Sequence, residues 1–220
     1  MSNKIATVVG STGLIGSHIV DILKKDSAYG KIRLLVRRPV SVEDSKIEVV
    51  VVNFEDFKSF KEEISGSDVV FCAIGTTNKK VKGNKTEYRK VDFDIPVNAA
   101  RFCEETGCQN FAIVSSVGAD SKSNNFYLKL KGEVEDFLKE SKIKSISVFR
   151  PSMLMGKRSE FRFAEEIAKI LIKPVSFLFP SRLKPVEGRN VASAMIKASE
   201  KGEAGFHVYH YKEIMDLCSK

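Results

Sequence analysis

The chain has 220 residues, of which 43% are hydrophobic and 29% charged, and its formal net charge is +8. This length can bury one sizeable core, so we expect a single domain over residues 1–220, with a less regular portion over 151–220. No stretch reaches the roughly 18 apolar residues that a membrane-spanning helix needs, and residues 1–9 lack the pattern of a secretory signal. We therefore predict a cytoplasmic protein that does not insert into a membrane.

The cysteines and the basic residues argue against a metal protein and a nucleic-acid-binding protein. Neither CxxC spacing nor a neighbouring histidine pair is present, so we predict no metal site and expect reduced, structural thiols at Cys72, Cys103, Cys108 and Cys218. Lysine and arginine are spread along the chain and alternate with acidic residues. This pattern favours a basic surface that attracts an anionic cofactor over binding to nucleic acid.

Apolar runs alternate with helical patterns along the first 150 residues. We predict strands at 4–9, 32–36, 47–52, 69–74, 111–114 and 145–149, and a last short strand at 206–209. We predict a first helix that ends near residue 25, and further helices over 86–105, 124–140 and 186–201. Nearly continuous apolar strands are typical of a parallel sheet that helices cover on both faces. The pattern predicts an α/β protein with a doubly wound, mostly parallel sheet, the NAD(P)-binding Rossmann fold.

Residues 161–180 fit this pattern least well. They combine a helical pattern with the apolar run ILIKPVSFLFP. A wall of a substrate pocket, a dimer face and ordinary buried packing all remain open for this segment.

A glycine-rich turn follows the first predicted strand and opens the first predicted helix. Gly10, Gly13 and Gly16 allow the backbone to approach a pyrophosphate closely, and the helix N-terminus offers N–H groups to it. A GxxGxxG triplet alone is weak evidence, but its position between strand and helix indicates a dinucleotide site. The residues expected to contact the cofactor here are Gly10, Ser11, Thr12, Gly13, Leu14, Ile15 and Gly16.

Two arginines stand where an NAD-selective site usually has an acidic residue. Arg37 and Arg38 follow the second predicted strand by one and two residues. A carboxylate would repel the 2′-phosphate of NADP, whereas a guanidinium can bind it through two hydrogen bonds. We therefore predict NADPH or NADP in preference to NAD. Further cofactor contacts are expected from Asn53, Phe54, Cys72, Ala73, Ile74, Gly75, Thr76 and Pro151.

Tyr127 and Lys131 form a YxxxK pair on one face of a predicted helix. The helix follows the strand that leads into Ser115 and Ser116, at the sheet edge where such folds bind ligands. In this interpretation Tyr127 protonates a carbonyl oxygen as hydride arrives, and Lys131 lowers the tyrosine pKa and holds the nicotinamide ribose. One of the two serines binds the substrate oxygen. The alternative is a packed tyrosine and a solvated lysine in a protein that binds the cofactor without turnover.

Several other polar residues are expected to have ordinary roles. His18, His207 and His210 neither cluster nor pair with a nucleophile. Met153 and Met155 are expected to be structural, although one of them could approach the nicotinamide. The cationic loop 78–85 is expected to be a solvated crossing that could close over the cofactor.

The chain resembles the atypical short-chain dehydrogenases/reductases similar to the human HIV Tat-interacting protein, an oxidoreductase-like family with many microbial relatives. The resemblance covers nearly the whole chain and rests on GSTGLIGSHIV from Gly10, LLVRRP from Leu34, FCAIGTT from Phe71, VDFDIPVNAA from Val91, VSSVGADSKSNNFYLKLKGEVE from Val114 and VFRPSMLMG from Val148. It implies NADPH across the glycine turn and the arginine pair, with Ser115 or Ser116, Tyr127 and Lys131 in the catalytic positions. It implies no particular substrate.

Three functions remain open at this stage. The first is an NADPH-dependent reductase or dehydrogenase that acts on a small carbonyl or alcohol. The second is an NADPH-binding regulator that binds a protein partner without turnover, and a homodimer is also open. The third is a sugar-nucleotide epimerase, which we expect less because such enzymes carry a larger C-terminal substrate domain.

Overall fold

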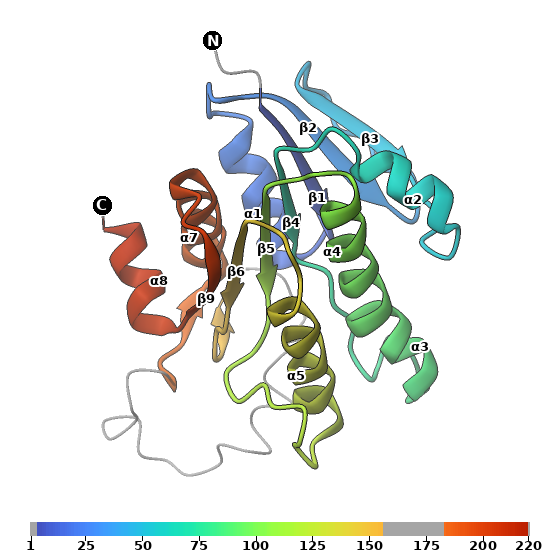
Figure 1. The fold of residues 1–220 in the computed structure, drawn as a ribbon, viewed down its shortest axis with the longest axis vertical. Helices are drawn as coiled ribbons and strands as arrows, with labels where there is room; N and C mark the ends of the chain where they lie inside the picture. The colour runs from blue at the N-terminus through green and yellow to red at the C-terminus, as the bar shows by residue number, and fades with distance from the viewer. Residues whose placement is uncertain (1–3, 156–182, 220) are drawn as a thin grey trace.

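A computed structural model describes residues 4–155 and 183–219 of the chain, and the predicted segment 161–180 lies outside these residues. Seven parallel strands form one sheet in the order β3-β2-β1-β4-β5-β6-β9 (Figure 1). These strands are β1 (Lys4–Val9), β2 (Tyr29–Val36), β3 (Ile47–Val51), β4 (Val69–Cys72), β5 (Asn110–Val114), β6 (Ser145–Phe149) and β9 (Gly205–Tyr209). The doubly wound parallel sheet predicted from the apolar runs is confirmed.

Helices cover both faces of the sheet (Figure 1). The helices are α1 (Leu14–Leu23), α2 (Phe57–Ile64), α3 (Lys85–Arg89), α4 (Ile95–Glu105), α5 (Phe126–Lys139), α7 (Gly188–Lys201) and α8 (Tyr211–Cys218). Side chains of α1, α7 and α8 pack in one apolar cluster with the sheet, and those of α2, α4 and α5 pack in another. Two-sided coverage explains why every residue of β4 and β6 is buried. Among the described helices, none is long and apolar enough to cross a membrane.

The chain after β6 contributes a small second sheet. Two short strands, β7 (Leu154–Met155) and β8 (Val186–Glu187), pair in parallel. The helix predicted over 186–201 therefore begins two residues later, at Gly188, because its first two residues belong to β8. It ends at Lys201, and the next residue, Gly202, has a φ of +57° and caps the helix in the left-handed conformation that glycine adopts easily.

The helix predicted over 86–105 is three elements in the structure. A π-helical turn, η1 (Lys90–Asp94), separates α3 from α4. Pro96 stands in the first turn of α4 and has no N–H to donate to the carbonyl four residues before it, which is that of Asp92. The missing donor gives a physical reason for the wider turn at this point. Such turns occur often at functional sites.

Candidate functional site

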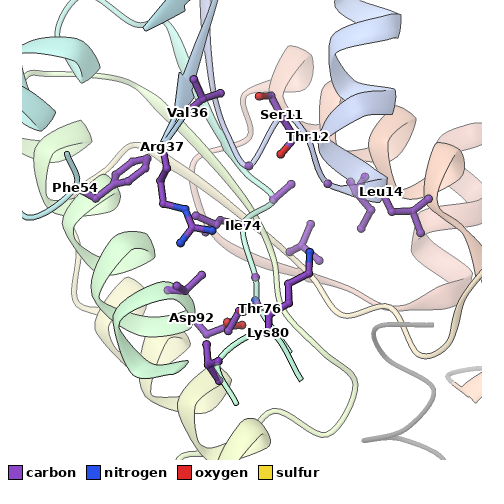
Figure 2. Close-up of a pocket in the computed structure, with 18 of the residues that line it drawn as sticks. Ser11, Thr12, Leu14, Val36, Arg37, Phe54, Ile74, Thr76, Lys80 and Asp92 are labelled. Carbon is purple, nitrogen blue, oxygen red and sulfur yellow. Dashed lines mark hydrogen bonds between the residues drawn. The ribbon is translucent and has the colours of Figure 1, made fainter. Parts of the chain in front are cut away.

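A cavity of about 1090 Å³ lies at the carboxyl ends of the central strands (Figure 2). The strand order reverses between β1 and β4, and ligands bind in open α/β sheets at such a reversal. Many of the residues predicted to bind the cofactor line this cavity, namely Gly10, Ser11, Thr12, Gly13, Leu14, Ile15, Arg37, Arg38, Phe54, Ala73, Ile74, Gly75, Thr76 and Lys131.

The glycine turn is packed so tightly that side chains are excluded from it. Gly10 has a φ of +90°, and a Cβ atom there would lie 2.7 Å from the backbone carbon of Ala73. A Cβ atom on Gly16 would lie 2.1 Å from the carbonyl oxygen of Gly10. One glycine therefore lets the turn lie against the end of β4, and the other lets α1 begin directly against the turn.

The N-terminus of α1 offers donors to a phosphate group. The cap residue, Gly13, has no side chain that could cap the helix, and the first turn of the helix has no acidic residue. The Ser11 side chain is 6% exposed, and among the described residues its hydroxyl oxygen has no hydrogen-bond partner. Free N–H groups, a positive helix end and a buried hydroxyl that lacks a protein partner fit a pyrophosphate. These features fit a bound dinucleotide.

The two arginines after β2 are exposed and line the same cavity. Within residues 4–155 and 183–219, neither Arg37 nor Arg38 has an ion-pair partner, whereas Arg33, Arg89 and Arg150 each pair with a glutamate. In Figure 2 the guanidinium of Arg37 extends from the end of β2 into the cavity. Two uncompensated guanidinium groups form a favourable setting for an anion.

Two of the further predicted cofactor contacts, Asn53 and Phe54, are divided between two cavities. Phe54 lines the main cavity and a neighbouring one of about 670 Å³, while Asn53 lines only the neighbouring one. Cys72 lies just before the cavity wall and is 1% exposed, and burial raises the pKa of its thiol to about 12. Pro151 is buried, and its carbonyl accepts a hydrogen bond from the N–H of Val117. Cofactor contact from Asn53, Cys72 and Pro151 stays a prediction.

Lys131 lies at the cavity wall in a buried ion pair that the sequence interpretation did not include. Its Nζ atom is 3.1 Å from Oδ1 of Asp92, and the two side chains are 5% and 2% exposed. The second oxygen of Asp92 accepts a hydrogen bond of 2.7 Å from the backbone N–H of Thr76. Burial raises the pKa of Asp92, against the opposing effects of the Lys131 charge and the Thr76 N–H. An aspartate on a predicted helix is usually solvated, so the sequence pattern gives no reason to expect Asp92 in the site.

Tyr127 is brought onto the same face of α5 as Lys131, one turn earlier. The lysine Nζ atom is 5.9 Å from the centre of the tyrosine ring. Tyr127 is 6% exposed and packs with Tyr88 and Leu130, and it is not among the residues that line the cavity. The structure therefore brings the YxxxK pair together and places its lysine on the cavity wall.

The two predicted serines are held in hydrogen bonds within the protein. Ser115 donates a hydrogen bond of 2.5 Å to the carboxylate of Glu135 on α5, which also binds the guanidinium of Arg150. Ser116 is fully buried and donates to the carbonyl of Val117. Neither serine lines the cavity, so their proposed contact with a substrate oxygen stays a prediction.

The histidines and methionines that were expected to have ordinary roles do not line the cavity. His210 caps the N-terminus of α8, and His207 contacts the carbonyl of Ala204. Met155 is 46% exposed on β7. In the cationic loop, Lys80 and Lys82 do line the cavity. His18 is half-buried on α1, and Met153 pairs through its carbonyl with Val186 of β8.

The fold and the cavity together define a dinucleotide-binding protein of the Rossmann type. The sequence matches the family model described as NAD(P)H-binding over residues 10–169. The chain therefore belongs to the NAD(P)H-binding family of atypical short-chain dehydrogenases/reductases.

Curated relatives extend over most of the chain. It is 33% identical to Protein HTATIP2 of Rattus norvegicus over 172 residues, which cover 77% of this chain and 70% of that protein. It is 36% identical to mitochondrial Protein FMP52 of Meyerozyma guilliermondii over 196 residues, which cover 87% of this chain and 83% of the relative.

Solved structures share the fold at low sequence identity. The UDP-N-acetylglucosamine 4-epimerase from Methanobrevibacter ruminantium superposes with a TM-score of 0.72 at 17% identity, covering 96% of this chain and 77% of that one. The enzyme WbmH of Bordetella bronchiseptica, solved in complex with NAD+, superposes with a TM-score of 0.71 at 16% identity, covering 95% of this chain and 76% of that one. At these identities the likeness shows the fold alone.

Proposed function

We propose that the protein is an NADPH-dependent oxidoreductase that reduces a small carbonyl compound or oxidises the corresponding alcohol. The observation that carries this proposal is the position of Arg37 and Arg38, two exposed guanidinium groups on the wall of the cavity that also contains Lys131. Arginine binds a 2′-phosphate through paired hydrogen bonds, and an acidic residue at this position would favour NAD instead. Bound NADPH would supply the hydride.

The residues of α5 have distinct roles in the proposed reaction. Tyr127 donates its phenolic proton to the carbonyl oxygen of the substrate and takes it back in the reverse direction. Lys131 holds the ribose next to the nicotinamide and provides a positive charge 5.9 Å from the tyrosine ring. Ser115 or Ser116 hydrogen-bonds the substrate oxygen, which for Ser115 requires release from Glu135.

Turnover of NADPH on a panel of aldehydes and ketones tests the proposal. We expect Tyr127→Phe to lower kcat by about 100-fold or more, since general acid catalysis contributes about that much. Tyr211→Phe at the start of α8 is the matched control, and we expect it to leave turnover unchanged. Equal turnover in Tyr127→Phe and the wild type would remove Tyr127 from the reaction.

A second candidate function is an NADPH-binding regulator that binds a protein partner or a second copy of itself. The engagement of Ser115 with Glu135 and the burial of Tyr127, which is 6% exposed, favour it. Tight NADPH binding without turnover on the whole panel, together with an NADPH-dependent change in association state, would favour this function over catalysis. For sugar-nucleotide epimerase activity, the comparison with solved structures offers the fold alone.

A cytoplasmic location is also part of the proposal. The name of the Meyerozyma relative contains the word mitochondrial, which makes mitochondria the alternative compartment. Cell fractionation with an antibody against the chain distinguishes the two.

A further inference from the structure

Two of the four cysteines lie close together where α4 leads into β5 (Figure 1). Cys103 is in the last turn of α4, and Cys108 stands two residues before β5 begins. Both are free thiols, and they are 0% and 4% exposed. They lie at the amino end of β5, whereas the cavity that fits a dinucleotide lies at the carboxyl ends of the strands. The two thiols are therefore separate from the cofactor site.

The backbone at the end of α4 brings these two side chains together. The N–H of Cys108 donates a hydrogen bond of 2.9 Å to the carbonyl of Cys103. The N–H of Gly107 donates one of 3.2 Å to the carbonyl of Glu104, and Gly107 has a φ of +77°. These two bonds and the left-handed glycine form a Schellman motif, which often brings the residue after the glycine into contact with the last turn of the helix. In this chain the residues at both contacting positions are cysteines.

The two sulfur atoms meet beside one backbone oxygen. The Sγ atoms of Cys103 and Cys108 are 3.9 Å and 3.5 Å from the carbonyl oxygen of Asn110. The thiols are also hydrogen-bonded to each other, which lowers the pKa of Cys108, while burial raises the pKa of Cys103. Cys108 is therefore the thiol that ionises first. A thiolate next to a second thiol is the arrangement from which a disulfide forms.

The cover over Cys108 is thin, in contrast to the setting of Cys72 in the middle of the sheet. The chain neighbours of Cys108, Gly107 and Gln109, are both exposed. A Cβ atom added to Gly107 would have no heavy atom within 4 Å, so little packs against the turn from outside. Turns with few contacts open locally at a small cost in free energy. A small reagent can therefore reach the thiol of Cys108 without unfolding of the sheet.

We propose that Cys103 and Cys108 are a redox-active dithiol, which a small disulfide such as oxidised glutathione converts into an intramolecular disulfide bond. The thiolate of Cys108 attacks one sulfur of the oxidised glutathione, forms a mixed disulfide and releases one glutathione. The sulfur of Cys103 then attacks that of Cys108 and releases the second glutathione. The dithiol loses two electrons, which the oxidised glutathione gains, and the two thiol protons end on the two released glutathione molecules. This proposal does not depend on the proposed function.

Peptide mapping after alkylation tests the proposal on the wild-type protein. The native chain is incubated with oxidised and reduced glutathione at a series of ratios, alkylated with iodoacetamide in urea and digested with trypsin. Cleavage after Arg101 and Lys122 leaves both cysteines in one peptide. We expect this peptide to lose both alkyl groups together as the oxidised form increases, and to regain both when dithiothreitol is added before alkylation. Cys218→Ser, which removes the thiol on α8, is the matched control and should leave this oxidation unchanged.

The variant Cys103→Ser measures how much the second thiol contributes. Without it, Cys108 can form only a mixed disulfide with glutathione. At a low, fixed concentration of reduced glutathione, we expect half-reaction to need at least about tenfold more oxidised glutathione than in the wild type, because a neighbouring thiol acts at a high effective concentration. Cys108→Ser provides the reciprocal comparison if circular dichroism shows that Cys103→Ser does not fold.

Three results would overturn the proposal. If the wild-type peptide keeps both alkyl groups at every glutathione ratio, the two thiols only fill space. If the wild type stops at a mixed disulfide with glutathione, the Schellman motif does not hold the sulfur atoms in a bonding arrangement. Equal half-reaction concentrations for the wild type and Cys103→Ser would show that the second thiol contributes nothing.

Discussion

Replacing Gly16 by alanine should separate cofactor binding from general stability. The added Cβ atom would lie 2.1 Å from the carbonyl oxygen of Gly10 and 2.8 Å from its carbonyl carbon. Contacts under 3.0 Å are essentially never observed, so the turn and α1 have to move apart by about 1 Å. Overpacking of this kind costs about 1 to 3 kcal/mol, and the better helix propensity of alanine offsets about 1 kcal/mol of it.

We expect a net loss of up to about 2 kcal/mol in the free energy of unfolding, or a fall of up to about 8 °C in Tm for a chain of this size. We also expect the Kd for NADPH to rise by about tenfold or more, because the displaced N–H groups no longer fit the pyrophosphate. The Kd for NADH should rise by the same factor, since both cofactors share the pyrophosphate. Calorimetric titration measures both constants.

Gly107→Ala is the matched control. Gly107 has a φ of +77° and open space around it, so the substitution is strained without any clash and lies far along the chain from the turn. It should lower Tm by a similar amount and leave the Kd for NADPH unchanged. If Gly16→Ala bound NADPH as tightly as Gly107→Ala does, the placement of the cofactor on the glycine turn would be refuted.

Three further predictions concern buried polar groups. Asp92→Asn alone should lower the free energy of unfolding by about 3 to 5 kcal/mol, because it leaves the Lys131 ammonium buried without a carboxylate. Adding Lys131→Met should recover more than half of that loss, as measured by urea unfolding. Additive losses in the double variant would contradict this expectation. Ser115→Ala should lower the free energy of unfolding by about 1.5 to 3 kcal/mol, because it removes a hydrogen-bond donor from the Glu135 carboxylate. An unchanged Tm would show that this hydrogen bond contributes nothing to stability. Alkylation of the native protein at pH 8 should spare Cys72, whose thiol has a pKa of about 12, and rapid modification at this residue would show that β4 is exposed.

The sequence predicts the sheet and the glycine turn well because both depend on local patterns. The strand Lys4–Val9 begins and ends as predicted, and the turn lies between strand and helix. The π-helical turn at 90–94 is different, because it depends on where a proline interrupts a helix that otherwise looks continuous. Helix α8 was not expected at all, since its eight residues form a pattern too short to stand out.

The polar network around α5 marks the limit of sequence reasoning about the site. Tyr127 and Lys131 are recognisable by their spacing, and the structure brings them together. Their neighbours come from distant parts of the chain, however. Asp92 forms an ion pair with Lys131, which lies 39 positions later in the sequence, and Ser115 donates a hydrogen bond to Glu135 on α5. Only the three-dimensional arrangement shows that the charge of the lysine is compensated.

Comparison of NADPH with NADH binding tests the central claim most directly. Calorimetry on the wild type should give a Kd for NADPH at least about tenfold lower than that for NADH, because one charge-assisted hydrogen bond is worth about that factor. In Arg37→Ser with Arg38→Ser the difference should disappear, while the Kd for NADH stays nearly the same. Equal wild-type affinities for the two cofactors would contradict the assignment of this cavity to NADPH.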